Sequence, residues 1–260
     1  MLNTELILSA LNSRTFGRTV YSFESIDSTN TFARGLDRNS APHGTVVIAD
    51  EQTSGRGRLQ REWISTKGMN LLLSVILYPE FNIEKTALLP LIGSLAVSDA
   101  VDALTGLTTS CKWPNDVLIG HKKFCGMLLE SASGSSGIEK IILGIGINVN
   151  QSEFPEGLLH KATSLRNECG KEIDRVSLLT AVLEELENRY EQLAHFPSAQ
   201  LLNDWKLKAL LFGKKITVLE SEFSYSAVAV DIAEDGGLII QTEDGEKKKI
   251  LAGDVSLAYQ

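Results

Sequence analysis

The sequence of 260 residues has few cysteines, no long apolar run and fewer basic than acidic residues. Its three cysteines, Cys111, Cys125 and Cys169, are odd in number and lack metal-ligand spacing, which predicts reduced thiols rather than a disulfide framework. No uninterrupted run of about 18 apolar residues occurs, and the apolar start MLNTELILSAL is short and has no basic residue. We therefore expect a soluble cytoplasmic protein without a signal peptide or a membrane partner.

Several common signatures of catalysis and binding are also missing. P-loop and G-x-G-x-x-G patterns do not occur, and the four histidines, His43, His121, His160 and His195, form no triad or metal-ligand pattern. The 33 acidic and 25 basic residues leave a net charge of -8, which disfavours binding to nucleic acid through its phosphates. No room for a helix-turn-helix module precedes the first predicted strands. We expect no repressor role, no nucleic-acid partner and no resident metal site.

The periodicity of the remaining residues predicts alternating strands and helices in the first four-fifths of the chain. Runs rich in β-branched residues predict strands at 20–26, 44–50, 70–77, 117–119, 123–130 and 141–149. Apolar residues at helical spacing predict helices at 2–11, 28–38, 84–104, 176–193 and 201–211. The segment 131–137 is rich in serine and glycine, and we expect it to form a turn.

The composition changes after Gly213. Short strands are predicted at 215–220, 224–232, 237–242 and 246–251, joined by the hairpin-like turns EDGG and EDGE. This pattern predicts a small β-barrel behind a larger unit. The fold class is therefore α+β, with one domain at 1–211 and a second at 212–260.

The stretch 52–63, QTSGRGRLQREW, is locally basic, whereas the chain as a whole has a negative net charge. Two glycines alternate with two arginines in Gly55-Arg56-Gly57-Arg58, and Arg61 follows. Glycine permits close approach of the backbone to a ligand, and the guanidinium fork matches phosphate and carboxylate. The loop is either a site for an anionic ligand or a solvated basic turn.

Four further polar clusters stand at predicted strand ends or loops. Each has a structural interpretation: a helix cap for 28–30 (STN), a turn for 112–116 (KWPND), a soluble edge for Lys123, and relief of packing for Gly144 and Gly146. The last cluster ends at Asn148. Taken alone, none of these clusters specifies a function.

The order and spacing of these motifs resemble the biotin protein ligase family. STN, EQTSGRGRLQREW, KWPND, KxxGxLxE and GxGIN follow one another, with Lys123 eleven residues after Lys112. The resemblance implies a mixed sheet flanked by helices, related to class II synthetase cores, followed by an SH3-like barrel. It also implies that biotin and MgATP react to biotinyl-5′-AMP, and that a lysine of a biotin carboxyl carrier protein then takes the biotin.

The resemblance further implies roles for individual residues. Those expected at biotin are Ser28, Thr29, Asn30, Gln52, Arg56, Gly57, Arg58, Lys123, Gly126 and Leu128. Those expected at the nucleotide are Arg58, Arg61, Trp63, Lys112, Asn115, Gly144, Gly146 and Asn148. Lys123, Arg58 and Asp116 are expected to be catalytic.

The chain departs from the family pattern at two positions that bear on adenine. Ala162 stands where some members have a tryptophan, and Ala258 where an arginine is often found. Three alternatives are a lipoate ligase, a catalytically silent biotin sensor and a transcriptional regulator. Both a monomer and a homodimer are compatible with the sequence.

Overall fold

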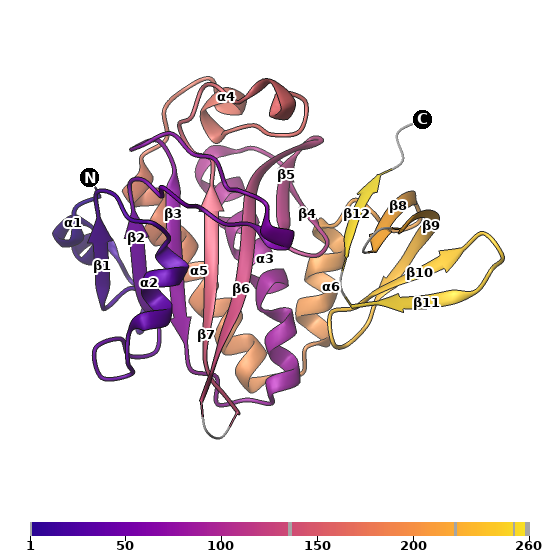
Figure 1. Cartoon of the computed structure of the whole chain (residues 1–260), viewed down its shortest axis with the longest axis horizontal. Helices are drawn as coiled ribbons and strands as arrows, with labels where there is room; N and C mark the ends of the chain where they lie inside the picture. Colours follow the sequence, from indigo (N-terminus) through magenta and orange to yellow (C-terminus); the bar gives the residue numbers. More distant parts are fainter. Residues whose placement is uncertain (1, 135–136, 221–222, 252, 258–260) are drawn as a thin grey trace.

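The computed structural model describes residues 2–134, 137–220, 223–251 and 253–257 of the chain. A mixed seven-stranded sheet forms the larger unit, and helices lie on both of its faces (Figure 1). In sheet order the strands are β1 (Val20–Phe23), β2 (Thr45–Ala49), β3 (Leu71–Leu77), β7 (Gly137–Ile147), β6 (Lys122–Gly134), β5 (Asp116–Ile119) and β4 (Thr109–Lys112). The pair β1–β2 is parallel, and every other pair is antiparallel.

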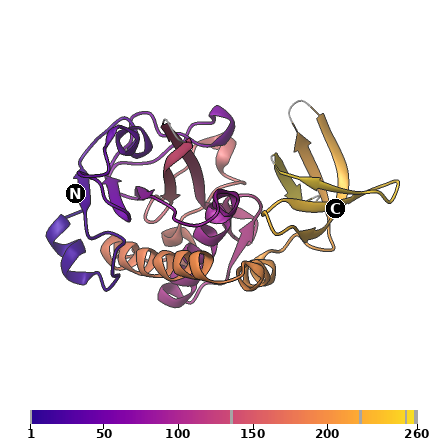
Figure 2. The ribbon, with the colours of Figure 1, turned by 90° about the horizontal axis from the view of Figure 1, so that it is seen from below.

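The helices divide between the two faces of this sheet. They are α1 (Thr4–Ala10), α2 (Thr29–Gly35), α3 (Leu89–Thr105), α4 (Leu165–Cys169), α5 (Arg175–His195) and α6 (Ala199–Lys208). The long helices α3 and α5 pack on one face, and α6 packs beside α3 (Figure 2). The short α2 packs on the opposite face against β2, β3 and β7. Three 3-10 turns, η1 (Arg58–Gln60), η2 (Ile83–Leu88) and η3 (Glu156–Leu158), complete the helical elements among the described residues.

Strand β3 shows why the sheet is buried on both sides. Its whole length is buried, which explains the continuous apolar run in the sequence. Leu71, Leu73, Val75 and Leu77 join the main core under α3 and α5, whereas Ile76 packs with the α2 side. Ser74 interrupts the apolar run of this strand and is fully buried. It belongs to the site described below.

Helix α3 lies against the sheet because it carries Gly93. A Cβ there would lie 2.8 Å from Sδ of Met127, so a larger residue would require the Met127 side chain to shift. By length and composition alone, the helical stretch Ile83–Thr105 could cross a bilayer. However, 67% of its most apolar 18-residue segment is buried inside the protein. Its apolar character is thus used in the core of the larger unit.

A five-stranded antiparallel, SH3-like sheet forms the C-terminal unit. Its order is β11 (Lys247–Ile250), β10 (Leu238–Thr242), β9 (Phe223–Ile232), β8 (Lys215–Glu220) and β12 (Asp254–Leu257). The indole of Trp113, within the KWPND motif, donates to the carbonyl oxygen of Gly236 at 2.9 Å and joins the two units. The boundary predicted between residues 211 and 212 falls between α6 and β8 and stays a prediction.

The α+β fold class is confirmed, and several details of the secondary structure differ from expectation, such as the strand expected at 20–26, which ends at Phe23, and the helix expected at 201–211, which ends at Lys208. The turn expected at 131–137 is wrong, since β6–β7 pairing continues to Gly134 opposite Gly137, with residues 135–136 outside the described part. The helix expected to reach residue 38 ends at Gly35. Strands β4 and β12 were not predicted, because each has only four residues of mixed polarity.

Candidate active site

The first wall of the site is the amino end of helix α2. Ser28 is its N-cap residue, with a side-chain oxygen that accepts from the backbone N–H of Thr31 at 3.5 Å. Thr29 and Asn30 follow in the first turn and are buried although polar. The helix cap expected at these residues is therefore present, and the same residues also line a cavity.

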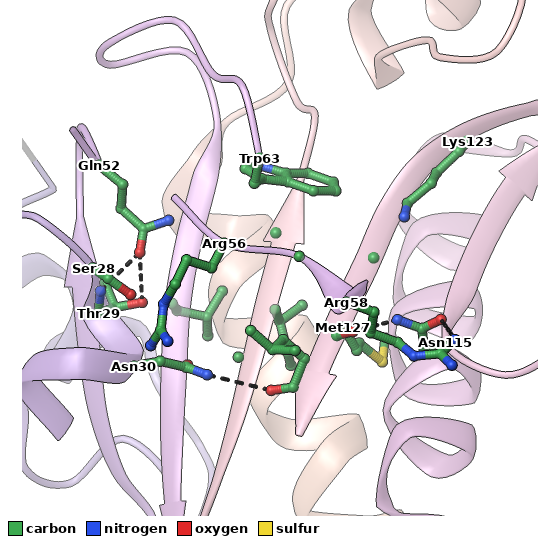
Figure 3. Close-up of a pocket in the computed structure, with 17 residues that line it drawn as sticks. Ser28, Thr29, Asn30, Gln52, Arg56, Arg58, Trp63, Asn115, Lys123 and Met127 are labelled. Atoms are coloured by element: carbon green, nitrogen blue, oxygen red, sulfur yellow. Dashed lines mark hydrogen bonds between the residues drawn. The ribbon is translucent and has the colours of Figure 1, made fainter. Parts of the chain in front are cut away.

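A hydrogen-bond network fixes the orientation of these side chains. Oε1 of Gln52 accepts from the backbone N–H of Thr29 at 2.7 Å and from its hydroxyl at 3.0 Å. Oγ of Ser74 lies 2.7 Å from Oγ1 of Thr29 and 2.6 Å from Oδ1 of Asn30. Because Oε1 of Gln52 is occupied in this way, its amide nitrogen is turned towards the cavity (Figure 3). The wall presents uncharged donors and acceptors only.

The floor of the cavity is made of glycines on adjacent strands. Gly126 of β6 pairs with Gly146 of β7, and Leu128 pairs with Gly144. A Cβ at Gly144 would lie 2.5 Å from Oδ1 of Asn30, and one at Gly146 would lie 2.6 Å from the indole of Trp63. Glycine is therefore required at both positions for other groups to reach the sheet.

Trp63 covers this floor. Its ring lies over Gly126 and Gly146, and Nζ of Lys123 is 5.3 Å from the ring centroid. Its indole nitrogen is buried and has no hydrogen-bond partner among the described residues. The space left in this first cavity is about 50 Å³.

The arginine loop closes the site from above and is held at both ends of η1. Arg58 donates to Oδ1 of Asn115 at 3.2 Å and forms an ion pair with Asp254 at 3.2 Å. Arg61 lies 2.6 Å from the other carboxylate oxygen of Asp254. Between the two arginines, Leu59 adopts a left-handed backbone conformation with φ of 55° and exposes its side chain. The C-terminal unit thus contributes a carboxylate to the loop.

The other end of the cavity is cationic. Nζ of Lys123 lies 2.6 Å from a carboxylate oxygen of Asp116. The backbone of Lys123 is paired with a neighbouring loop: its N–H donates to the carbonyl of Lys161 at 2.8 Å, and its carbonyl accepts from Thr163 at 3.0 Å. The amide of Asn115 donates to the carbonyl of Met127, which fixes the KWPND motif to β6.

A second, larger cavity of about 510 Å³ adjoins the first. Its lining includes Lys112, Asn148, Phe154 and Ala162. Oδ1 of Asn148 is buried without a partner among the described residues, while its Nδ2 donates to the carbonyl of Thr163 at 3.1 Å. Five residues line both cavities: Gly57, Arg58, Trp63, Asn115 and Lys123. The two cavities therefore adjoin at the guanidinium of Arg58 and the ammonium of Lys123.

Most of the residues expected at the site come together in these two cavities. The first is lined by Ser28, Thr29, Asn30, Gln52, Arg56, Gly57, Arg58, Lys123, Gly126 and Leu128, which are the residues expected at biotin. Arg61, Lys112 and Asp116 line the second. Gly144 and Gly146 line the first cavity and not the second, and their expected role at the nucleotide stays a prediction.

Three residues of the site were not anticipated. Ser74 is a polar residue within an apolar strand, and that break in the pattern was its only signal. No sequence pattern pointed to Asp254, because its partner Arg58 is 196 residues away in the sequence. Glu130 is the last residue of the KxxGxLxE motif and had no assigned role.

The structure also bears on metals and nucleophiles. Among the described residues, no group of three or more histidine, cysteine, aspartate and glutamate side chains could hold a metal ion. Burial raises the pKa of the Cys111 thiol to about 12 and also raises that of Cys125. Neither thiol is an activated nucleophile.

The mixed sheet with its paired cavities, followed by an SH3-like unit, defines a protein ligase of the biotin and lipoate class. Residues 22–148 match the model of the biotin/lipoate A/B protein ligase family, and residues 211–258 match that of the biotin protein ligase C-terminal domain. The chain belongs to the biotin protein ligase family.

Named relatives and solved structures agree with this membership. The chain is 36% identical to the bifunctional ligase/repressor BirA of Bacillus spizizenii, over 98% of this chain and 79% of that protein. It is 34% identical to the biotin–[acetyl-CoA-carboxylase] ligase of Mycobacterium tuberculosis, over 82% and 78%. The structure of a biotin protein ligase from Aquifex aeolicus in complex with biotin and ATP has a TM-score of 0.81 and 35% identity, with coverage of 94% of this chain and 100% of that one.

Proposed function

We propose that this ligase activates biotin with ATP to biotinyl-5′-AMP and transfers the biotinyl group to a lysine of a biotin carboxyl carrier protein. The observation that carries the proposal is the junction of two cavities of different character. One is narrow and floored by glycine, with an uncharged wall at Ser28, Thr29 and Gln52, and the other is larger. Arg58 and Lys123 line both, so two anionic groups from two substrates can meet there.

The first cavity suits a neutral bicyclic ureido ring. Such a ring has two N–H donors and a carbonyl acceptor, and the wall formed by Ser28, Thr29 and Gln52 supplies uncharged partners for them. The glycine floor admits a flat ring close to the sheet. Trp63 fills much of this space, so we propose that its indole moves when the ring enters.

The second cavity suits the nucleotide. The unpartnered Oδ1 of Asn148 is an acceptor that fits an exocyclic amine, such as that of adenine. Arg58, Arg61 and Lys112 supply positive charge for the phosphates. Because Ala162 leaves no aromatic group at its position, we assign no stacking role there.

In the proposed first step, a carboxylate oxygen of biotin attacks the α-phosphorus while the bond from that phosphorus to the pyrophosphate oxygen breaks. Lys123 and Arg58 offset the repulsion between the two anions and the charge that develops on the phosphate oxygens. Mg²⁺ is usually held by phosphates and one or two carboxylates. Asp116 is the carboxylate that fits this role, and the ion when bound would neutralise phosphate charge.

In the proposed second step, the ε-amine of the carrier lysine attacks the carbonyl carbon of the mixed anhydride, and AMP leaves. No enzyme nucleophile takes part, in agreement with the buried, high-pKa thiols. We place this activity in the cytoplasm with a carrier protein as partner. Given the net charge of -8, we propose no role for nucleic acid bound through its phosphates.

The test is incubation of the purified chain with biotin, MgATP and a carrier domain, read by streptavidin blotting, together with biotin-dependent pyrophosphate exchange. We expect both signals with biotin and neither with lipoate, because buried donors without partners cost about 1–3 kcal/mol each. Equal exchange with lipoate would replace the proposal by a lipoate ligase. Tight biotin binding without exchange would make the chain a silent sensor.

A further inference from the structure

Glu130 stands on β6 next to the wall residue Asn30 and has a side-chain exposure of 14%. On β6 it follows Gly126 and Leu128 at intervals of two residues, so its side chain shares their face of the sheet. This glutamate has no part in the chemistry proposed above. Its surroundings nevertheless connect three parts of the site.

Three donors converge on its carboxylate. Oε2 accepts from Nδ2 of Asn30 at 2.7 Å and from Nη2 of Arg56 at 3.2 Å. Oε1 accepts from Nη2 of Arg34 at 3.1 Å. Asn30 belongs to the fixed wall, Arg56 to the arginine loop and Arg34 to the last turn of α2. One carboxylate therefore joins the wall, the loop and the helix.

The contact with Asn30 sets the direction of its amide group. The amide nitrogen is directed to Glu130 and to the carbonyl of Leu128, at 2.7 and 3.4 Å. The amide oxygen is left to face Ser74 and the backbone of Gly144. A rotation of the amide by 180° would place its oxygen against the carboxylate, where two acceptors would face each other without a donor. Glu130 thus selects an acceptor at the cavity floor.

The contact with Arg56 ties the loop to the same point. Arg56 also donates to the hydroxyl of Thr31 at 3.2 Å, so its guanidinium bridges α2 and β6. Its side chain is 44% exposed, and the ion pair is therefore partly screened by water. The carboxylate of Glu130 therefore accepts hydrogen bonds both from Asn30 in the wall of the cavity and from Arg56 in the arginine loop.

We propose that Glu130 is a positioning residue for biotin, a latch that holds the arginine loop closed through Arg56 while it orients Asn30. The latch rests on the proposed function, since biotin is the ligand that it would retain. It acts on binding and not on the chemical step, because Glu130 and Lys123 stand near opposite ends of β6, with Gly126 and Leu128 of the first cavity between them.

The first experiment measures biotin affinity by calorimetry and adenylate formation at saturating biotin. Glu130→Gln keeps the shape of the side chain and removes the charge that two arginines share. We expect the Kd for biotin to rise about fivefold, in the range of a partly screened charged contact, while the adenylation rate at saturation stays within about twofold. Arg34→Met is the matched control, because it removes only the contact outside the cavity, and we expect it to change the Kd less than about twofold.

A double-variant cycle separates the latch from a purely structural role. Arg56→Met should raise the Kd similarly. In the double variant with Glu130→Gln and Arg56→Met, the Kd should rise by less than the product of the two single increases. An unchanged Kd in Glu130→Gln would overturn the latch. So would a loss in Arg34→Met as large as that in Glu130→Gln, since helix α2 alone would then explain the effect.

Hydrogen exchange gives a reading that does not depend on biotin. In the ligand-free protein, Glu130→Gln should exchange faster than the wild type across residues 54–62 and equally across β3. If the wild type bound no biotin, the proposed function would fail, and this measurement would still decide whether Glu130 holds the loop. Equal exchange across 54–62 in both proteins would refute the latch.

Discussion

The ammonium of Lys123 and the carboxylate of Asp116 form an ion pair of 2.6 Å across the β5–β6 hairpin. The pair lies beside the junction of the two cavities, because Lys123 lines both and Asp116 lines the larger. The lysine is thus held near the place where carboxylate and phosphate would meet, before either is bound.

Lys123→Met should slow adenylate formation about a hundredfold, because it keeps the aliphatic stem and removes the charge that offsets anion repulsion. Single-turnover measurement of biotinyl-AMP gives the rate, and thermal unfolding reports on folding. Transfer from pre-made biotinyl-AMP to the carrier should change less. Lys112→Met should be milder, since Lys112 lines only the larger of these two cavities. The reverse order of the two variants would show that the wrong lysine has been assigned.

Asp254→Asn should raise the KM for ATP several-fold and the KM for biotin less. It removes the carboxylate that holds Arg58 and Arg61, at 3.2 and 2.6 Å, at the larger cavity proposed for the nucleotide. These contacts are partly exposed, so the effect per ion pair is about 1 kcal/mol or less. Pyrophosphate exchange at varied ATP measures it. Glu243→Gln, which removes an exposed carboxylate in the turn between β10 and β11 of the same unit, is the control.

Residues 54–62 should exchange amide hydrogens quickly without ligand and slowly with biotinyl-AMP. The loop exposes most of its side chains and is held largely by contacts of its three arginines. Hydrogen-exchange mass spectrometry with and without the adenylate tests this, with β3 as a protected reference. An unchanged loop would argue that it does not act as a lid.

Stability should fall as the pH drops from about 7 to 5, in part through His43. Burial lowers the pKa of His43 below its usual value, and this outweighs the opposite effect of Glu191 and Glu80. The neutral ring accepts from the backbone N–H of Tyr78 at 3.0 Å through Nδ1. Its contribution is complete above the unfolded pKa of about 6.5 and is lost as the pH falls through the lower folded value.

His43→Asn keeps an acceptor and removes the titration. Thermal unfolding between pH 7.5 and 5 should therefore show a smaller loss for the variant than for the wild type. Parallel curves for the two proteins would assign the acid sensitivity to other groups.

The sequence was most informative where a local pattern decides the structure. Strand β3 and helix α5 were predicted to within one or two residues at each end, because their apolar residues repeat with the period of the element. The turn expected over all of 131–137 failed for the opposite reason: its composition favours a turn, but antiparallel pairing extends β6 to Gly134 and starts β7 at Gly137.

The candidate site was partly predictable in the same sense. The resemblance to the biotin protein ligase family identified the residues of the first cavity. It did not identify the contacts that hold them, because these contacts join distant segments. Arg56 and Glu130 are 74 residues apart, and Arg58 and Asp254 are 196 apart, at separations where no periodicity applies. Glycines 144 and 146 indicated a close approach, but only the fold shows that Asn30 and Trp63 make it.

The pairing of the Lys123 backbone with residues 161–163 has a consequence for inhibitor design. Because the lysine and one rim of the larger cavity are hydrogen-bonded to each other, displacement of that rim is transmitted to the lysine. A compound that wedges the rim outwards, without entering the glycine-floored cavity, would draw the ammonium away from the reaction centre. Such a compound would occupy the larger cavity alone and would act on the lysine through these backbone hydrogen bonds.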